Sequence, residues 1–409
     1  MRVGILAANL SVYGGGEKYV CKIAEIFSRE HDVDLIAFDI PEREVAGVLK
    51  TLENRLNVNL RDVNLKVLAT PGIVGIAMKN SFIDRLIQST VVSKCSKHYN
   101  LFSFVDLLTK SVVVSKCSKH YDLFINQSGG GLFLQGPAYA NKNIMIIQVP
   151  PTNEKIPFPF GCTGLKLFVD SNLSTYDRIV VYSNFVKTTV EQKYTRKAEV
   201  LYPPIESQPD HCILKEHYIL SVGRFGVGEH SKKQLEMIQA FKQLCKDGEL
   251  DEGHWEYHLV GVVLSKQSSQ LYKRICEKEA EGYPIFFHFN APYKTVKDLY
   301  SRSTLFWHAT GFNEDENKHP EKMEHFGLVT AEAMSYGCIP IVVGKGGQPE
   351  IVHHGLNGLL WNTIEELKGS TLNLVNDPEK RAKLAKAAIE TSRQFTTDQF
   401  EIKVKELLI

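Results

Sequence analysis

Short apolar runs alternate with longer amphipathic stretches along most of the chain, and the alternation starts again near its middle. A short apolar run predicts a buried strand, and an amphipathic stretch between two such runs predicts a helix. The runs lie at Arg2–Ala8, Val33–Phe38, Leu65–Ala69, Leu123–Asn126, Ile144–Val149 and Ile179–Tyr182, and then at Tyr218–Val222, Tyr257–Val262, Ile285–Phe289, Leu305–His308 and Ile339–Val343. Strands that alternate with helices predict parallel sheets with helices on both faces, so we expect two doubly wound α/β domains.

The boundary between the two predicted domains lies in a proline-rich segment. Pro203, Pro204 and Pro209 interrupt regular structure before a new strand begins at Tyr218. We therefore predict an N-terminal domain over residues 1–205, a C-terminal domain over 206–377 and C-terminal helices over 378–409.

Composition narrows the class of protein. A chain of 409 residues is long enough for two cores, and its 43% hydrophobic and 23% charged residues are typical of a folded globular protein. The 48 basic and 47 acidic residues leave a net charge of +1, which argues against nucleic acid as a partner. The start of the chain lacks the pattern of a signal peptide, no stretch is long enough to cross a bilayer, and the 8 cysteines are scattered, so we expect a cytoplasmic protein.

The richest motif is Glu324–Val352, EHFGLVTAEAMSYGCIPIVVGKGGQPEIV. Good helix formers predict a helix from about Gly327 to Tyr336, and Gly337 supplies a left-handed stop. The first turn of that helix has free N–H groups and the positive end of the helix dipole, which suit a phosphate. Glu324 precedes the helix and Glu332 lies on it, so both carboxylates are expected to face one bound ligand.

A second constellation follows the strand that starts at Tyr218. A glycine-bearing loop leads from Arg224 to a helix that is expected to begin near Ser231, with Ser231 as its N-cap. Arg224 and Lys232 are then placed at the carboxyl edge of the sheet, where two cations can neutralise a diphosphate. The next residue, Lys233, is interpreted as a solvated surface charge.

These two motifs resemble the nucleotide-sugar site of the GT-B glycosyltransferases, in particular the retaining family four of the glycosyl transferases group 1. The signature of that family is a Glu, seven residues and a second Glu, which here are Glu324 and Glu332. The resemblance implies two Rossmann-like domains that face each other across a cleft, with the last helix crossing back to the N-terminal domain. It implies that Glu324, Arg224 and Lys232 act in catalysis and that the donor is bound by Glu332, Phe326, Gly327, Leu328, Gly346 and Gly347.

The N-terminal domain offers a glycine loop and one departure from the family. Gly14, Gly15 and Gly16 follow the first strand and precede a helix expected from Glu17, and they form a wall without side chains for the donor phosphate or the acceptor. Many relatives carry a His after the fifth strand, where this chain has Gln148. Because an amide does not exchange protons near neutral pH, a general base at Gln148 is not expected.

The resemblance implies a hexosyltransferase that moves a sugar from a UDP or GDP donor, with retention of configuration, to a glycan, lipid-linked or small-molecule acceptor. No cofactor or metal is expected, and attachment to the cytoplasmic face of a membrane is compatible with this role. Two alternatives stay open: a non-catalytic sugar- or nucleotide-binding protein on the same fold, and a glycoside phosphorylase. The base, the sugar, the acceptor, the linkage and the oligomeric state are not determined, and Gly261–Ser265 and Phe289–Pro292 are only candidates for base recognition.

An internal repeat occupies the N-terminal half: Val91–Phe102 recurs as Val113–Phe124 with one substitution, Asn100 for Asp122. Each copy has a Cys-x-x-His pair, but this spacing is a weak zinc signal, and a tandem duplication is the simpler interpretation. Because the second copy runs into a predicted strand, we expect it to hold the native position and residues 91–112 to be a surface excursion.

The roles of two residues stay open, and one acidic segment has a simple interpretation. His308 is interpreted either as lining the cleft or as an ordinary core or loop residue. Glu350 either closes the donor pocket or caps the next element. The acidic run at residues 313–325, with its histidines, is interpreted as a solvated loop rather than as a metal site.

Overall fold

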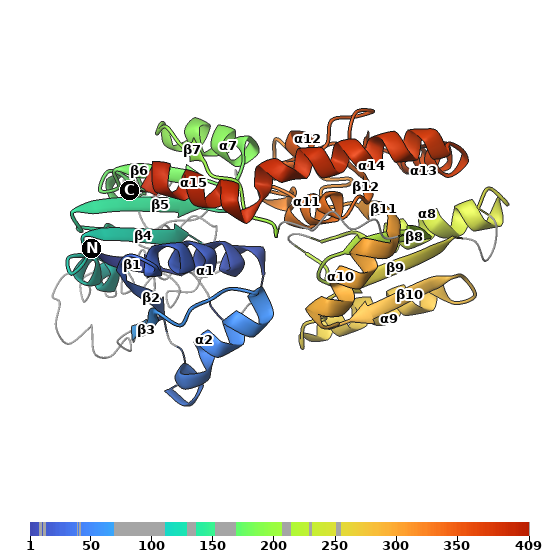
Figure 1. Cartoon of the computed structure of the whole chain (residues 1–409). Coiled ribbons are helices and arrows are strands. Elements are labelled where there is room, and N and C mark those ends of the chain that lie inside the picture. Colours follow the sequence, from blue (N-terminus) through green and yellow to red (C-terminus); the bar gives the residue numbers. More distant parts are fainter. Residues whose placement is uncertain are drawn as a thin grey trace, which may run out of the picture. The chain divides into compact units, whose positions relative to one another are not determined.

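The computed structural model describes residues 1–7, 10, 14–38, 40, 42–68, 111–128, 136–151, 169–206, 214–228, 231–250 and 255–408. The chain forms two compact units. Unit 1 comprises Met1–Tyr182, Val186–Leu201 and Val404–Ile409, and unit 2 comprises Ser183–Phe185 and Tyr202–Lys403. Figure 1 shows that each unit is a sheet flanked by helices, so the predicted pair of α/β domains is confirmed.

Unit 1 contains a sheet of seven parallel strands in the order β3-β2-β1-β4-β5-β6-β7. The strands are β1 (Arg2–Leu6), β2 (Asp32–Phe38), β3 (Val63–Leu68), β4 (Leu123–Ser128), β5 (Lys142–Ile147), β6 (Arg178–Val181) and β7 (Glu199–Val200). The first six confirm the predicted strands. The prediction missed β7, because a strand of two residues leaves no periodic pattern.

The named helices that begin in unit 1 are α1 (Gly15–Ser28) and α2 (Glu42–Leu56), and residues 111–118 and 169–173 are also helical. Two helices span both units: α7 (Asn184–Tyr194) starts in unit 2 and continues in unit 1, and α15 (Thr397–Leu408) starts in unit 2 and ends in unit 1. The expectation that the first helix begins at Glu17 is wrong. The side chain of Glu17 accepts a hydrogen bond from the N–H of Gly14 at 3.0 Å, so the helix starts two residues earlier and includes Gly15 and Gly16.

Unit 2 contains a sheet of six parallel strands in the order β10-β9-β8-β11-β12-β13. The strands are β8 (Glu216–Val222), β9 (Glu256–Gly261), β10 (Ile285–Phe289), β11 (Ser303–His308), β12 (Ile339–Val343) and β13 (Leu359–Trp361). The prediction missed β13, a strand of three residues. The helices are α8 (Gln234–Lys246), α9 (Gln267–Ala280), α10 (Tyr293–Arg302), α11 (Leu328–Ser335), α12 (Gln348–Ile351), α13 (Ile364–Asn376) and α14 (Pro378–Ser392), with short 3₁₀ turns at Pro320–Lys322 and Arg393–Phe395.

Both faces of the unit 2 sheet are buried. Leu305 and Trp307 of β11 pack into one hydrophobic cluster, while Phe306 between them packs into the other. Successive side chains of a strand point to opposite faces, so helices must cover both sides. This burial explains why the strands are continuous apolar runs in the sequence.

The start of α8 differs from the expectation. Lys233, not Ser231, is the N-cap, and it has a left-handed backbone with φ 53°. Ile238, Phe241 and Leu244, spaced three residues apart along α8, are fully buried and form its inward face. The inward face was therefore predictable, whereas the left-handed turn before it left no propensity signal.

The second copy of the repeat lies in the described part of unit 1, and the first copy lies outside the described residues. Residues 111–118 form a helix that ends shortly before β4. Ser111 and Val114 are buried within it, so the helix starts inside the predicted surface excursion. The excursion was therefore assigned two residues too many at its carboxyl end.

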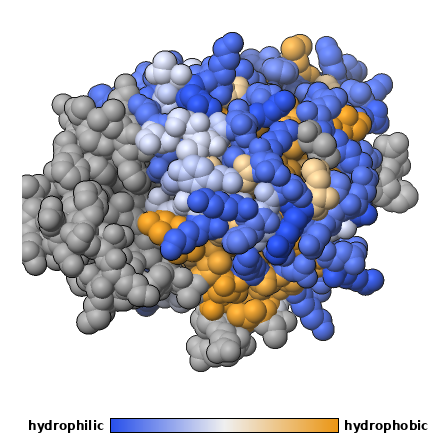
Figure 2. Space-filling model, turned by 90° about the vertical axis from the view of Figure 1, so that its left-hand side faces the viewer, coloured by the Kyte–Doolittle hydropathy of each residue, from blue (hydrophilic) through white to orange (hydrophobic). Residues whose placement is uncertain are grey.

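On the face shown in Figure 2, side chains of described residues are mostly hydrophilic, and hydrophobic ones gather in its lower part. In the part of the chain that the structure describes, no helix has the length and apolar character needed to cross a membrane.

Candidate functional site

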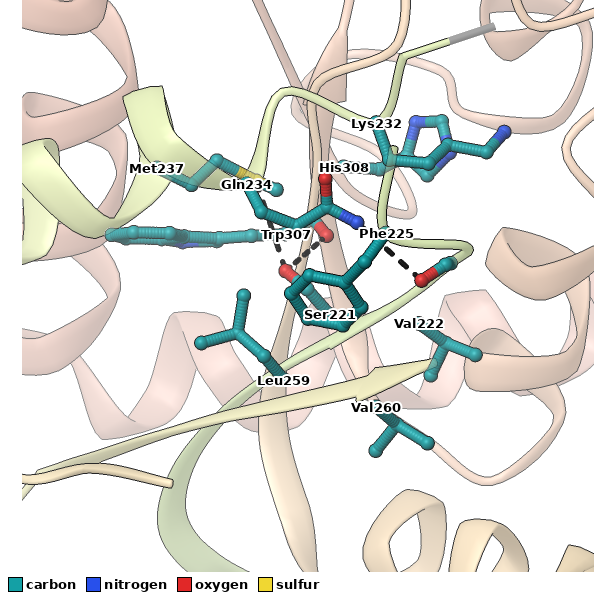
Figure 3. Close-up of a pocket in the computed structure, with 11 residues that line it drawn as sticks. Ser221, Val222, Phe225, Lys232, Gln234, Met237, Leu259, Val260, Trp307 and His308 are labelled. Atoms are coloured by element: carbon teal, nitrogen blue, oxygen red, sulfur yellow. Dashed lines mark hydrogen bonds between the residues drawn. The ribbon is translucent and has the colours of Figure 1, made fainter. Parts of the chain in front are cut away.

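The strand order of unit 2 reverses between β8 and β11. Open α/β sheets bind ligands at the carboxyl ends of their strands, at such a reversal. A pocket at this edge is lined by residues that end or follow these strands, among them Gly223, Phe225, Lys232, Gln234, Trp307 and His308 (Figure 3). The topology thus brings the two motifs of the sequence to one edge of one sheet.

One carboxylate oxygen of Glu324 contacts two side chains, a lysine and a histidine. Lys232 Nζ lies 2.7 Å from Glu324 Oε2, and His308 Nε2 lies 3.1 Å from the same atom. The His308 side chain is 3% exposed, and those of Lys232 and Glu324 are 17% and 16% exposed. The predicted catalytic Glu324 and Lys232 therefore come together, in a largely buried position.

The surroundings keep this carboxyl group ionised. Burial alone would raise the pKa of Glu324, but Lys232 and the hydrogen bond from His308 outweigh burial and hold that pKa well below its usual range. Burial also lowers the pKa of His308, although Glu324 opposes the effect. At neutral pH the site therefore holds a carboxylate beside a neutral imidazole.

The other ring nitrogen of His308 contacts a second buried side chain. Gln348 Nε2 lies 3.1 Å from His308 Nδ1, and Gln348 is 0% exposed. From the sequence alone, the role of His308 stayed open and Gln348 was not predicted as a site residue. A signal existed: His308 is the last residue of β11, and a polar residue at the end of a fully buried strand points to a ligand site.

The helix predicted after Glu324 is confirmed as α11, with Gly327 as its N-cap at φ 108°. A side chain at this φ is strained, which explains the glycine. Within the described residues, the N–H groups of Leu328 and Val329 have no hydrogen-bond partner, as expected for the first turn of a helix. The Phe326 ring is 3% exposed and packs in the core, so this residue offers a ligand only its backbone.

Glu332 has other neighbours than Glu324. The Tyr300 hydroxyl donates to Glu332 Oε2 at 3.4 Å, and the carboxylate is partly exposed on α11. Burial, aided by Glu332, raises the pKa of Tyr300 well above its usual value, so this phenol stays protonated and remains a donor. The ribose-binding role of Glu332 stays a prediction.

The glycine pair after β12 packs against the backbone of the Glu324 segment. The N–H of Gly347 donates to the carbonyl of Glu324 at 2.7 Å, and the N–H of Gly346 donates to Glu316 Oε1 at 2.7 Å. A side chain at either glycine would overlap with the backbone of Glu324 or His325. The pair thus holds Glu324 in place, and its predicted contact with the donor stays a prediction.

The cations of the second motif differ in exposure. Arg224 is exposed just beyond β8, and Gln234 Nε2 donates to its carbonyl at 3.0 Å. Lys232 instead packs along Gly223, where an added Cβ would come within 2.8 Å of Lys232 Cγ. The expectation that Lys233 is a solvated charge is wrong, because its Nζ pairs with Glu314 at 3.0 Å and its side chain is 16% exposed.

In unit 1, Gly16 and Gln148 are brought together by a third residue. Gln127, buried at the end of β4, donates through Nε2 to the carbonyl of Gly16 at 3.0 Å and to Gln148 Oε1 at 3.3 Å. A side chain at Gly16 would overlap with Gln148, so this glycine is required for close packing. Gln127 was not predicted as a site residue, although it is an amide at the end of an apolar strand.

The sequence of residues 206–391, nearly all of unit 2, matches the family of glycosyl transferases group 1. Solved structures resemble the whole chain. HepE of Anabaena in complex with UDP and glucose is 16% identical, covers 100% of this chain and 99% of its own, and gives a TM-score of 0.62. The sucrose-phosphate synthase of Thermosynechococcus elongatus is 14% identical, covers 99% of this chain and 98% of its own, and gives a TM-score of 0.68. The whole chain therefore has the GT-B fold, and its residues 206–391 carry the family match.

A curated relative of this chain is an uncharacterized glycosyltransferase of Methanocaldococcus jannaschii. The two are 24% identical over 234 residues, which are 56% of this chain. The alignment spans 59% of the length of that relative.

Two surface features of the chain are more structured than the sequence indicated. In the acidic run, Glu314 pairs with Lys233 and also with Lys322 at 3.2 Å, so the run is not simply a solvated loop. Glu350 lies within α12 and does not cap the element that follows it, β13. Its carboxylate accepts the N–H groups of Asn184 at 2.8 Å and Phe185 at 2.6 Å and therefore caps α7.

Among the described residues, no three His, Cys, Asp or Glu side chains form a group that could bind a metal ion. In the second repeat copy, Cys117 is buried while His120 is exposed. Cys95 and His98 of the first copy lie outside the described residues.

Proposed function

We propose that this protein is a glycosyltransferase that moves a hexose from a nucleoside diphosphate donor to an acceptor, with retention of configuration. The observation that carries the proposal is the contact of Lys232 and His308 with Glu324, at the reversal of strand order and beside the start of α11. A carboxylate for the sugar and a cation for the diphosphate are the groups that such a transfer needs.

Each group has a task in the proposed reaction. The N–H groups at the start of α11 bind the diphosphate, and Lys232 with Arg224 stabilises the negative charge that develops as it leaves. Glu324 accepts a hydrogen bond from a sugar hydroxyl, and Glu332 binds the ribose. Since Gln148 cannot exchange a proton near pH 7, we propose that the acceptor hydroxyl attacks from the face that the diphosphate leaves. The new bond to the sugar carbon forms as the bond to the diphosphate oxygen breaks, and the hydroxyl proton passes to that departing oxygen.

UDP-hexoses are the first donors to test. HepE was solved with UDP and glucose, and an Escherichia coli neighbour was solved with UDP-2-fluoro glucose. GDP-hexoses are the second group. We propose that the reaction needs no metal ion or other cofactor, that the acceptor is a glycan, a lipid-linked saccharide or a small molecule, and that the protein works in the cytoplasm or on the cytoplasmic face of a membrane.

The test combines binding and turnover. Thermal unfolding is recorded with UDP- and GDP-hexoses, because a ligand present at about 100 times its Kd stabilises the folded state by roughly 2.7 kcal/mol. Release of UDP or GDP is then followed with candidate acceptors, with and without EDTA. Lack of any shift with any donor, in a folded protein, would refute the proposal.

The main competing function is a binding protein without turnover, and Gln148 is the observation that favours it. Donor binding without nucleotide release, over the full set of acceptors, would support that alternative. A glycoside phosphorylase would instead release a sugar phosphate when it is incubated with inorganic phosphate and a disaccharide.

A further inference from the structure

We propose that His308 is a positioning residue that holds Glu324 in its reactive orientation, and that Gln348 fixes the ring nitrogen that carries the proton. This inference rests on the proposed function, because Glu324 is the residue assigned to the donor sugar. It assigns roles in the reaction to His308 and Gln348, two residues that are not part of the family signature.

The contact with Gln348 decides which ring nitrogen of His308 carries the proton. An amide nitrogen only donates hydrogen bonds, so Gln348 Nε2, at 3.1 Å, makes His308 Nδ1 an acceptor. A neutral imidazole with a bare Nδ1 carries its proton on Nε2. That N–H then donates to Glu324 Oε2 at 3.1 Å, and Thr310 Oγ1 lies 3.4 Å from the same nitrogen.

The second step concerns the two carboxylate oxygens. Both contacts of the Glu324 carboxylate, from Lys232 and from His308, fall on Oε2. Among the described residues, Oε1 forms no hydrogen bond or ion pair with a side chain. The carboxylate is thus held through one oxygen, and the other is left to accept a hydrogen bond from the donor sugar.

The third step distinguishes the two anchors. Lys232 is a flexible cation, and the diphosphate of a bound donor competes with Glu324 for it. His308 is 3% exposed in β11 and carries no charge for the diphosphate to attract. When the donor binds, His308 is therefore the anchor that keeps Glu324 in place.

The fourth step connects the anchor to α11. Gln348 is fully buried, and a Cβ at Gly327 would lie 3.0 Å from its Oε1. The amide is therefore confined between the start of α11 and His308. Its confinement keeps Nε2 directed at the ring.

The test compares three variants with wild type. His308→Phe removes both ring nitrogens and is expected to lower kcat roughly 10- to 100-fold, since a small misplacement of a reacting group has effects of this size. Donor Kd is expected to change less than about 3-fold. His308→Gln keeps a donor near the Nε2 position and is expected to recover most of kcat. Gln348→Glu places an acceptor at Nδ1 and is expected to lower kcat as His308→Phe does.

The matched control is His258→Gln. His258 is also buried in a strand of unit 2, and its Nε2 lies 3.0 Å from Glu256 Oε2. This variant is expected to change stability but not kcat. If it lowers kcat as much as His308→Phe does, the effect is general destabilisation and the proposal is wrong.

A readout without turnover separates this inference from the proposed function. Nitrogen NMR of the imidazole rings is expected to show His308 with its proton on Nε2 in wild type and on Nδ1 in Gln348→Glu. A wild-type ring with its proton on Nδ1 overturns the positioning role. Lack of turnover in wild type with the expected tautomer refutes the transfer reaction instead.

Discussion

Each unit of the protein has a glycine next to a buried polar cluster, but the two clusters differ in charge. In unit 2, Glu324 is surrounded by Lys232 and His308, and Gly347 donates to its backbone. In unit 1, Gly16 and Gln148 are joined by the amide of Gln127. Because amides neither carry charge nor exchange protons near pH 7, Gln127 and Gln148 cannot supply the charge that Glu324 and Lys232 supply in unit 2.

The comparison also explains what the glycines do. Gly346 and Gly347 allow two backbone segments to touch beside an ionised group, whereas Gly16 allows a helix to touch a neutral side chain. Glycine-rich loops that look alike in the sequence therefore support different tasks. Their neighbours, which come from distant parts of the chain, decide the task.

The largest expected effect comes from Glu324→Ala, compared with Glu332→Ala. We expect Glu324→Ala to lower kcat roughly 100- to 1,000-fold, because it removes a charged group from the reacting centre. Glu332→Ala is expected to weaken donor binding about 10-fold with a smaller change in kcat. Steady-state nucleotide release and donor titration by calorimetry measure both. Equal losses of donor affinity would contradict the division of roles.

Acid is expected to destabilise unit 2 through its buried histidines. Burial lowers the pKa of His325 to about 4, with a smaller opposing effect of Glu324. Since the folded pKa lies below the unfolded value near 6.5, stability is complete above pH 6.5 and is lost as the pH falls toward 4, by on the order of 3 kcal/mol. The lowered pKa of Glu324 adds a loss below about pH 4.5.

Urea unfolding between pH 4 and 8, followed by the signal of the buried Trp307 and Trp361, measures this dependence. His325→Gln, which keeps a donor for the carbonyl of Glu321, serves as the comparison. It is expected to have a shallower slope between pH 6.5 and 4. The same slope in both proteins would exclude His325 as the cause.

A smaller effect is expected at the glycines of unit 1. Gly16→Ala would force a methyl group into Gln148 and is expected to destabilise the protein by about 1–3 kcal/mol. The matched control is Gly47→Ala in α2, where no atom lies within 4 Å of an added Cβ, so stabilisation by about 0.5–1 kcal/mol is expected. Chemical denaturation measures both changes. Stabilisation by Gly16→Ala would show that the close packing with Gln148 is absent.

The smallest effect is expected from deletion of residues 91–112. In the shortened chain Ser89 and Thr90 precede Val113, as Ser111 and Val112 do now. Serine thus returns to the buried position of Ser111, and Thr90 replaces Val112, which is 48% exposed. We expect soluble expression and a Tm within a few degrees of wild type. Loss of soluble protein would count against a simple duplication.

Much of the fold could be predicted from the sequence, because parallel strands buried on both faces leave continuous apolar runs. Eleven such runs correspond to strands, whereas β7 and β13, of two and three residues, were too short to detect. The start of α8 was misplaced because Lys233 adopts a left-handed backbone without a glycine. Local propensity does not report a conformation that tertiary contacts impose.

The sequence by itself determined the two α/β units and the helix α11, because these depend on local periodicity. The family resemblance, not periodicity, placed Glu324 and Lys232 in one site. Only the tertiary structure decided that His308 and Gln348 hold Glu324 and that Gln127 joins Gly16 to Gln148. The reason is physical. A buried hydrogen bond depends on which strand ends meet at one edge of a sheet, and residues far apart in the chain carry no mark of that meeting.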